Sequence, residues 1–251
     1  MLWYKSWLET RWRFLIGLAL LLCSAAATVF TYPQVMKLLP MVPTNVSGPL
    51  GERIREAAEL ARDYRGYVWS QWFQKNGSQW ATLFAILLGT AGLLSQSNGA
   101  LFTLSLPVSR ARLLGIRAAT GLSELLLLAF VPSLLIPMLS PAIRESYGVG
   151  NALVHSVCLF VAASVFFSLA FLLSTVFDDL WPPLLIALAI AIALGLLEQI
   201  LRSPSFKVYR VMSAETYFRT GHVPWLGLLT TAAASAALCY GAVVNIQRRD
   251  F

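Results

Sequence analysis

Residues 79–117 read QWATLFAILLGTAGLLSQSNGALFTLSLPVSRARLLGIR and hold two apolar spans with a short polar break between them. The sequence LPVSR at 106–110 stands just before the second span. Its Pro107 lacks a backbone N–H and biases the residue before it away from helical dihedrals. Arg112 and Arg117 follow, and cations beside an apolar span are typical of the cytoplasmic face of a membrane. We therefore predict that a membrane helix reverses direction here and that the turn faces the cytoplasm.

The composition is that of a protein embedded in a bilayer. Of 251 residues, 57% are hydrophobic and only 12% are charged, which is too little polar surface to cover a soluble globule. The lysines and arginines behind the net charge of +7 lie between and beside the apolar runs. We interpret them as topology determinants and contacts to the lipid bilayer, and expect no nucleic acid partner. Cys23, Cys158 and Cys239 show no paired spacing, so we expect no disulfide framework, metal site or cofactor.

Six apolar spans each approach the ~20 residues that cross ~30 Å of hydrocarbon. They predict an all-α, polytopic protein of the bacterial cytoplasmic membrane, with residues 1–251 forming a single transmembrane domain. An even number of spans returns the C-terminus to the side of the N-terminus, and basic residues near both place them inside. The outer segment 202–222 departs from this rule, because it carries four cations. The expected spans are approximately Phe14–Thr31, Gln79–Ser95, Leu113–Leu139, Leu153–Val176, Leu184–Leu201 and Trp225–Ile246.

The N-terminal segment, Met1–Arg13, has helical two-sided patterning. An amphipathic helix with tryptophan on its apolar side suits the membrane interface, although a plain basic flank is the alternative. A cleavable signal peptide over residues 1–31 is a further alternative, but a start this rich in tryptophan is atypical of one. The apolar half holds Trp3, Tyr4, Trp7, Leu8 and Trp12, and the polar half holds Lys5, Ser6, Glu9, Thr10 and Arg13.

The connection over residues 32–78 is too long for a tight turn. It begins rich in proline and becomes helical in pattern from Gly51, with apolar residues at three- and four-residue steps. We predict a long extracytoplasmic loop with a helix that either caps the bundle or lines a substrate exit, and we favour the cap. Further along, Pro132 and Pro137 predict a kink or break in the third span. The segment after Glu198 has an interfacial or partly re-entrant pattern.

The turn after the second span resembles the cytoplasmic turn of ABC type-2 transporter permeases. In that family the turn forms a short coupling helix that docks on the ATPase subunit, and an acidic residue normally precedes the glycine. Here Ser95, Gln96 and Ser97 stand in that region instead. The resemblance implies the permease subunit of an ABC exporter, working as a dimer, either a homodimer or with a paralogous permease, beside a separate ATP-binding cassette ATPase. The matching residues are Gly99, Leu101, 104–110 and Leu113-Leu114.

The coupling turn is expected at 96–112. Asn98 is placed to cap a short helix from Gly99 to Leu106, Leu101 and Leu104 form a row able to enter a groove on the ATPase, and Pro107 ends that helix. A simple connecting turn is the alternative. Arg110 suits either coupling or membrane anchoring, and it completes the candidate coupling residues Asn98, Gly99, Leu101, Leu104, Pro107 and Arg110.

Glu124 is the acid nearest the middle of a predicted span. A carboxylate there is costly unless it is paired or wet, so a functional role is open, and the alternative is that Glu124 is protonated or hydrogen-bonded between helices at a dimer interface. No GxxxxGK[ST] loop, HExxH or GxSxG motif occurs, so we expect no enzyme and place ATP hydrolysis in the partner chain. An ATPase-independent carrier or a structural component of an envelope complex is the alternative function. The transported substrate is not encoded in any motif.

Overall fold

The computed structural model describes residues 2–41, 48–90, 110–177, 179–200 and 207–248. These residues are helical and contain no strand, so the all-α prediction is confirmed for the described part of the chain. Five of the described helices are long and apolar enough to cross a membrane, which supports a membrane protein. They are Leu2–Met41, Arg112–Ile143, Val149–Ser174, Trp181–Glu198 and Trp225–Arg248. The number of spans in a bilayer stays a prediction.

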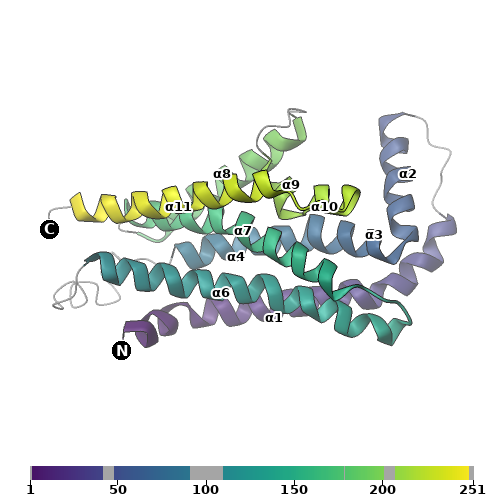
Figure 1. The fold of residues 1–251 in the computed structure, drawn as a ribbon, viewed down its shortest axis with the longest axis horizontal. Coiled ribbons are helices and arrows are strands. Elements are labelled where there is room, and N and C mark those ends of the chain that lie inside the picture. The colour runs from purple at the N-terminus through teal and green to yellow at the C-terminus, as the bar shows by residue number, and fades with distance from the viewer. Residues whose placement is uncertain (1, 42–47, 91–109, 178, 201–206, 249–251) are drawn as a thin grey trace.

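The described elements follow one another in the order shown in Figure 1. They are α1 (Leu2–Leu38), η1 (Leu39–Met41), α2 (Pro49–Arg62), α3 (Tyr64–Val68), the π-helix η2 (Trp69–Asn76), α4 (Gly77–Gly89), α6 (Arg110–Leu139), η4 (Ser140–Ile143), α7 (Val149–Ser174), α8 (Trp181–Ile200), α9 (Val208–Met212), α10 (Glu215–Thr220) and α11 (Trp225–Arg248).

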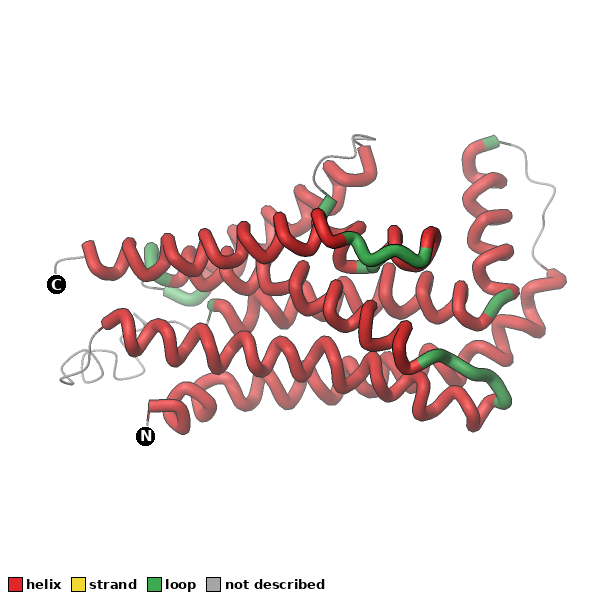
Figure 2. The backbone as a smooth tube through the Cα atoms, in the orientation of Figure 1, coloured by secondary structure: helices red, strands yellow, loops and turns green. Residues whose placement is uncertain are grey.

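The long helices form an elongated bundle, with helical segments along its length and described loops near its ends (Figure 2). Both termini lie at one end, which we call the N/C end, and the last turn of α4 and the first turn of α6 lie there too (Figure 1). At the opposite end, the far end, α2 projects away from the bundle. Helix α8 leans away from α7 and α11 as it runs toward the far end.

Helix α1 is one continuous helix of 37 residues that joins the N-terminal segment to the first expected span. The two predicted halves of that segment are present, because Trp3, Tyr4 and Trp12 are exposed while Ser6 and Thr10 are buried. The polar half faces the protein rather than water, since α1 packs along α6. Trp7, assigned to the apolar half, packs against Phe14 of the core, whereas Trp3, Tyr4 and Trp12 are free to meet lipid. The interfacial position of this segment stays a prediction.

The predicted loop at 32–78 begins inside α1, which continues to Leu38, and then contains η1, helix α2 and the beginning of a continuous helical run formed by α3, η2 and α4. The residues at both internal junctions, Trp69 and Gly77, have right-handed helical dihedrals, so the chain does not turn between these elements. Trp69, Trp72 and Phe73 are almost completely buried. This run, Tyr64–Gly89, therefore belongs to the packed bundle, although the side of the membrane on which residues 32–78 lie stays a prediction.

Helix α6 runs without a break through Pro132 and Pro137. A break was one of the two outcomes expected from these prolines. Ser133 lies beside them and donates its hydroxyl to the carbonyl of Ala129 at 2.7 Å, while Trp72 of η2 donates its indole N–H to the same hydroxyl at 3.4 Å. Serine side chains and neighbouring helices commonly satisfy backbone groups near a proline in membrane helices. The helix therefore continues through both positions.

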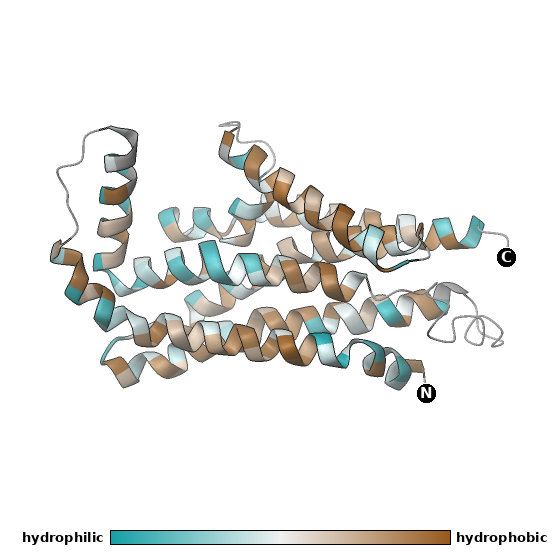
Figure 3. Cartoon of the chain, turned by 180° about the vertical axis from the view of Figure 1, so that it is seen from behind, coloured by the Kyte–Doolittle hydropathy of each residue, from teal (hydrophilic) through white to brown (hydrophobic). Residues whose placement is uncertain are grey.

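Helix α7 lies at the centre of the bundle, with α4, α6, α9 and α11 packed against it. Phe166 and Phe167 are among its fully buried side chains. Figure 3 shows apolar residues along much of the outer helices, with hydrophilic residues more frequent toward the helix ends and in the run that begins at α3. A bundle whose outer surface is apolar and whose core contains small and aromatic residues suits a lipid environment.

Candidate functional site

Most of the predicted coupling residues, Asn98, Gly99, Leu101, Leu104 and Pro107, lie outside the described residues, and their role stays a prediction. Arg110 is the first residue of α6. The helices that flank this stretch are described: α4 ends at Gly89, and both its end and the start of α6 lie at the N/C end (Figure 1).

Glu124 lies on the face of α6 that packs against α1, with only 2% of its surface exposed. The hydroxyl of Thr10 donates to its Oε1 at 2.5 Å. Its other carboxylate oxygen, Oε2, has no hydrogen-bond partner within the described residues. The bond to Thr10 joins α1 and α6 within the chain, and a contact at a dimer interface stays a prediction. A functional role for Glu124 stays a prediction.

Two more polar contacts join α1 to its neighbours in the same half of the bundle. Glu9 forms an ion pair with Arg117 of α6 at 2.9 Å. Arg13 donates from Nη1 to the carbonyl of Leu87 in α4 at 2.8 Å. Together with the Thr10–Glu124 bond, these contacts tie α1 to both helices that flank the predicted coupling turn. Arg117, which the sequence suggested as a membrane anchor, is therefore also a partner of α1.

A cavity of about 560 Å³ lies between η2, α4, α8 and the segment that begins at Lys207. One wall carries the polar side chains of Gln74, Ser78 and Gln79, and α8 supplies an apolar wall. The third wall, formed by the segment that begins at Lys207, is charged. The apolar wall consists of Ala191, Ile192, Gly195 and Leu196, and the charged lining residues are Glu198, Lys207, Arg210 and Glu215.

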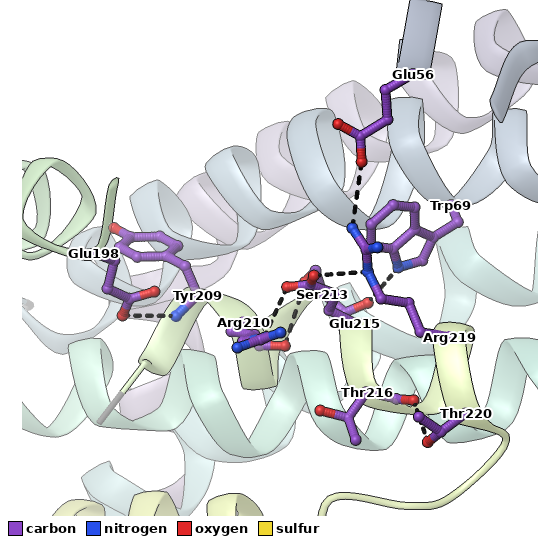
Figure 4. Close-up of polar contacts among 10 residues, drawn as sticks. All are labelled: Glu56, Trp69, Glu198, Tyr209, Arg210, Ser213, Glu215, Thr216, Arg219 and Thr220. Atoms are coloured by element: carbon purple, nitrogen blue, oxygen red, sulfur yellow. Dashed lines mark hydrogen bonds and ion pairs between the residues drawn. The ribbon is translucent and has the colours of Figure 1, made fainter. Parts of the chain in front are cut away.

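Tyr209 of α9 holds α8 and α9 together at the cavity (Figure 4). Its backbone N–H donates to Glu198 Oε1 at 3.1 Å, and its hydroxyl donates to the carbonyl of Ala191 at 3.0 Å. Burial raises the pKa of Tyr209 further above neutral pH, and the protonated hydroxyl serves as a donor. The ring lies beside Gly195 of α8, where a Cβ would be 3.5 Å from it, an ordinary contact. The two helices are thus joined by polar contacts around one aromatic ring.

A chain of ion pairs leads from the cavity to α2 (Figure 4). Arg210 Nε pairs with Glu215 Oε2 at 2.9 Å, and Glu215 Oε1 pairs with Arg219 Nε at 2.8 Å. Arg219 then reaches Glu56 of α2 at 3.4 Å. The charged wall of the cavity is therefore connected, through α10, to the helix that projects from the far end.

Trp69 fixes α9 and α10 against the bundle. Its indole N–H donates to the carbonyl of Ser213 at 2.9 Å, and its ring stacks on Phe218 of α10 with 4.3 Å between centroids. Because Trp69 belongs to the same helical run as Ser78, the polar and charged walls of the cavity are anchored to one element. The short helices at the far end are therefore part of the packed structure.

Sequence reasoning did not predict this cavity. It identified the segment after Glu198 as interfacial or partly re-entrant. The available signal was the excess of cations in the outer segment 202–222, which contradicts the usual charge distribution. A cation that membrane topology does not require is a reason to look for a partner or a ligand.

No group of three potential metal-ligating His, Cys, Asp or Glu side chains occurs among the residues that the structure describes. Cys23, Cys158 and Cys239 are free thiols. In comparisons with known proteins, no family model, no curated protein and no solved structure matches this chain.

Proposed function

We propose that this chain is the membrane-spanning permease subunit of an ABC exporter, driven by ATP hydrolysed in a separate ATPase subunit. The observation that carries the proposal is the turn around LPVSR at 106–110, with its resemblance to the coupling turn of ABC type-2 permeases. The ends of the two flanking helices support it, because they lie at the same end of the bundle as both termini. That arrangement is the one expected if the termini and the turn share the cytoplasmic side.

We take the run Tyr64–Gly89 as the sixth crossing, which begins earlier than the expected span Gln79–Ser95 and shortens the expected outer loop of residues 32–78. It is continuous, it is packed against α1, α6 and α7, and its C-terminal end lies at the N/C end. At about 1.5 Å per residue for an α-helix, a run of this length suffices to cross ~30 Å of hydrocarbon. Together with the five long apolar helices it makes the six crossings that return the C-terminus to the side of the N-terminus.

The contacts of α1, α4 and α6 offer a route for coupling. An ATPase that moved the turn would displace the end of α4 and the start of α6 together. The ion pair of Arg117 with Glu9 and the hydrogen bond of Arg13 with Leu87 link both helices to α1. Helix α4 also carries Ser78 and Gln79 into the wall of the cavity. A movement at the N/C end therefore has a continuous packed path to the far end.

The test changes the apolar row of the turn. The double substitution Leu101→Asp/Leu104→Asp should leave membrane insertion intact, abolish co-purification of the ATPase and remove substrate-stimulated ATP hydrolysis, because a charged row cannot enter an apolar groove. The ATPase to co-express is one encoded in the neighbouring gene and recognised by its Walker and LSGGQ motifs. The matched control is Leu101→Met/Leu104→Met, which keeps the apolar row and should retain both properties.

Normal ATPase binding and transport by the double aspartate variant would contradict the coupling site. Full transport activity of the purified chain alone, in vesicles without ATPase, would contradict the ABC function itself. That outcome would instead favour a carrier, for which the unpartnered carboxylate oxygen of Glu124 inside the bundle is the supporting observation.

A further inference from the structure

The two acids that line the cavity are already engaged by the protein. Glu198 accepts the backbone N–H of Tyr209 at 3.1 Å. Glu215 uses both of its oxygens, one for Arg210 and the other for Arg219. Both carboxylates of the lining therefore already have hydrogen-bond or ion-pair partners within the protein.

The two cations of the lining, Lys207 and Arg210, have fewer partners within the protein than the two acids. Lys207 forms no ion pair with any residue that the structure describes. Arg210 pairs with Glu215 only through Nε, and its side chain is 43% exposed, so its terminal nitrogens remain open to further hydrogen bonds. Gln74 and Gln79 add two amide groups to the opposite wall. Lys207 and the terminal nitrogens of Arg210 are therefore charged donors without an acidic partner among the described residues, and such donors favour an anionic group.

The remaining wall is apolar and continues onto the outer surface of the bundle. Ile192 and Leu196 line the cavity, yet each is 55% exposed, on a helix that is apolar enough to cross a membrane. An occupant that places a charged group against Lys207 and Arg210 can therefore extend an apolar chain along α8 without entering water. A small inorganic anion would leave this wall without a partner.

We propose that this cavity binds an amphiphile with an anionic headgroup. The headgroup is held by Lys207 and Arg210, and the apolar chain lies along Ile192 and Leu196 of α8. A volume of about 560 Å³ is within the range of ligand sites, roughly 300–1,000 Å³, and accommodates a headgroup with the first part of a chain. The inference does not depend on the energy source for transport, because it concerns binding in a cavity away from the N/C end.

The test uses three probes that separate the two parts of the ligand. The full chain is placed in nanodiscs of phosphatidylcholine and titrated with decyl phosphate, decanol and inorganic phosphate, with empty nanodiscs subtracted, by isothermal titration calorimetry. Decyl phosphate should show saturable binding to one site per chain. Decanol and inorganic phosphate should each bind at least about tenfold more weakly, because each lacks one of the two recognised parts.

Two pairs of variants assign the binding to the cavity. Lys207→Gln/Arg210→Gln should weaken decyl phosphate binding by at least about tenfold, since charge-assisted hydrogen bonds are lost. Lys37→Gln/Arg144→Gln removes the same charge from exposed positions at the far end and should leave binding unchanged. Leu196→Gln, at a position that is 55% exposed, should weaken decyl phosphate but not inorganic phosphate.

Three outcomes would overturn the proposal. Equal weakening by both double variants would mean general attraction of anions to a basic surface. Inorganic phosphate binding as tightly as decyl phosphate would mean a site for a soluble anion, and decanol binding as tightly would mean simple partitioning into an apolar surface. Since no ATP or ATPase is present, none of these results bears on the ABC proposal, and loss of the coupling phenotype would not affect this one.

Discussion

Helices α7 and α8 are neighbours in the chain and similar in composition, but they occupy very different environments. Neither contains a charged residue apart from Glu198 near the end of α8. Within the most apolar window of each, 61% of α7 is buried in the protein, against 17% of α8. Helix α7 carries small polar residues, such as Ser156, Ser164 and Ser168, whereas leucine and isoleucine side chains of α8 face outward. Apolar composition therefore identifies a membrane helix without identifying its neighbours, and small polar residues point to the central one.

The largest expected effect is the loss of an aromatic side chain from α7. Phe167 is buried and stacks on Phe171, and its ring fills the space beside Gly121 of α6. Phe167→Ala should reduce the free energy of unfolding by about 3–5 kcal/mol, because it leaves a cavity between packed helices. Unfolding in mixed micelles, followed by circular dichroism, measures this change.

The control for Phe167→Ala is Leu196→Ala on α8, which removes a half-exposed side chain and should change the free energy of unfolding by less than about 1 kcal/mol. Similar losses for the two variants would show that α8 is as tightly packed as α7 in the membrane, for example by a second copy of the chain.

A smaller effect is expected from a methyl group added where α4 meets α7. A Cβ at Gly89 would collide with the backbone carbonyl of Phe167 and lie 2.9 Å from the Cβ of Ala170. Gly89→Ala should therefore destabilise the protein by about 1–3 kcal/mol, since backbone atoms cannot move aside as a side chain can. On α8, Gly195→Ala places its Cβ 3.5 Å from the ring of Tyr209, an ordinary contact, and should be tolerated. Thermal unfolding of both variants in the same detergent compares them, and equal midpoints would contradict the close α4–α7 contact.

The smallest of these effects concerns the attachment of α8 itself. Tyr209→Phe removes the hydroxyl that donates to Ala191 and should cost about 0.5–1.5 kcal/mol, the usual range for a single hydrogen bond. Because α8 has few other buried contacts, the loss should be local: amide hydrogen exchange should become faster in α8 and stay unchanged in α7. Tyr240→Phe, at an exposed position of α11, is the matched control and should alter neither helix. Faster exchange in α7 as well would mean that the two helices open together.

Several features could be predicted from the sequence because they depend on local chemistry. The all-helical architecture follows from long apolar runs, and the two halves of the N-terminal segment follow from its periodicity. The prediction of Glu124 as a distinctive residue rested on the cost of a carboxylate in an apolar span. The structure adds that it is hydrogen-bonded to Thr10, 114 positions earlier in the chain. No periodicity within either segment could have identified that partner.

The continuity of α3, η2 and α4 was not predicted, since proline, charge and tryptophan between residues 32 and 78 are typical of an external connection. Burial of Trp69 and Trp72 comes from helices that lie far away in the sequence, namely α6 and the segment around Ser213. Aromatic residues with a polar N–H suit both a membrane interface and a packed core with a nearby acceptor. Whether such a residue lies at the interface or in the core depends on whether the fold places a hydrogen-bond acceptor near its N–H.

Hydrophobicity is a property of each residue, so the amino-acid sequence determined that this chain is helical and suited to a bilayer. Which apolar helix lies at the centre, which leans away, and where the cavity forms depend on shape complementarity and on polar partners from distant segments. The donors of Lys207 and Arg210 became a candidate ligand site only when α9 and α10 were placed beside α4 and α8. Tertiary structure alone decided this, because helices in lipid associate through close packing and a few hydrogen bonds rather than through the hydrophobicity they all share.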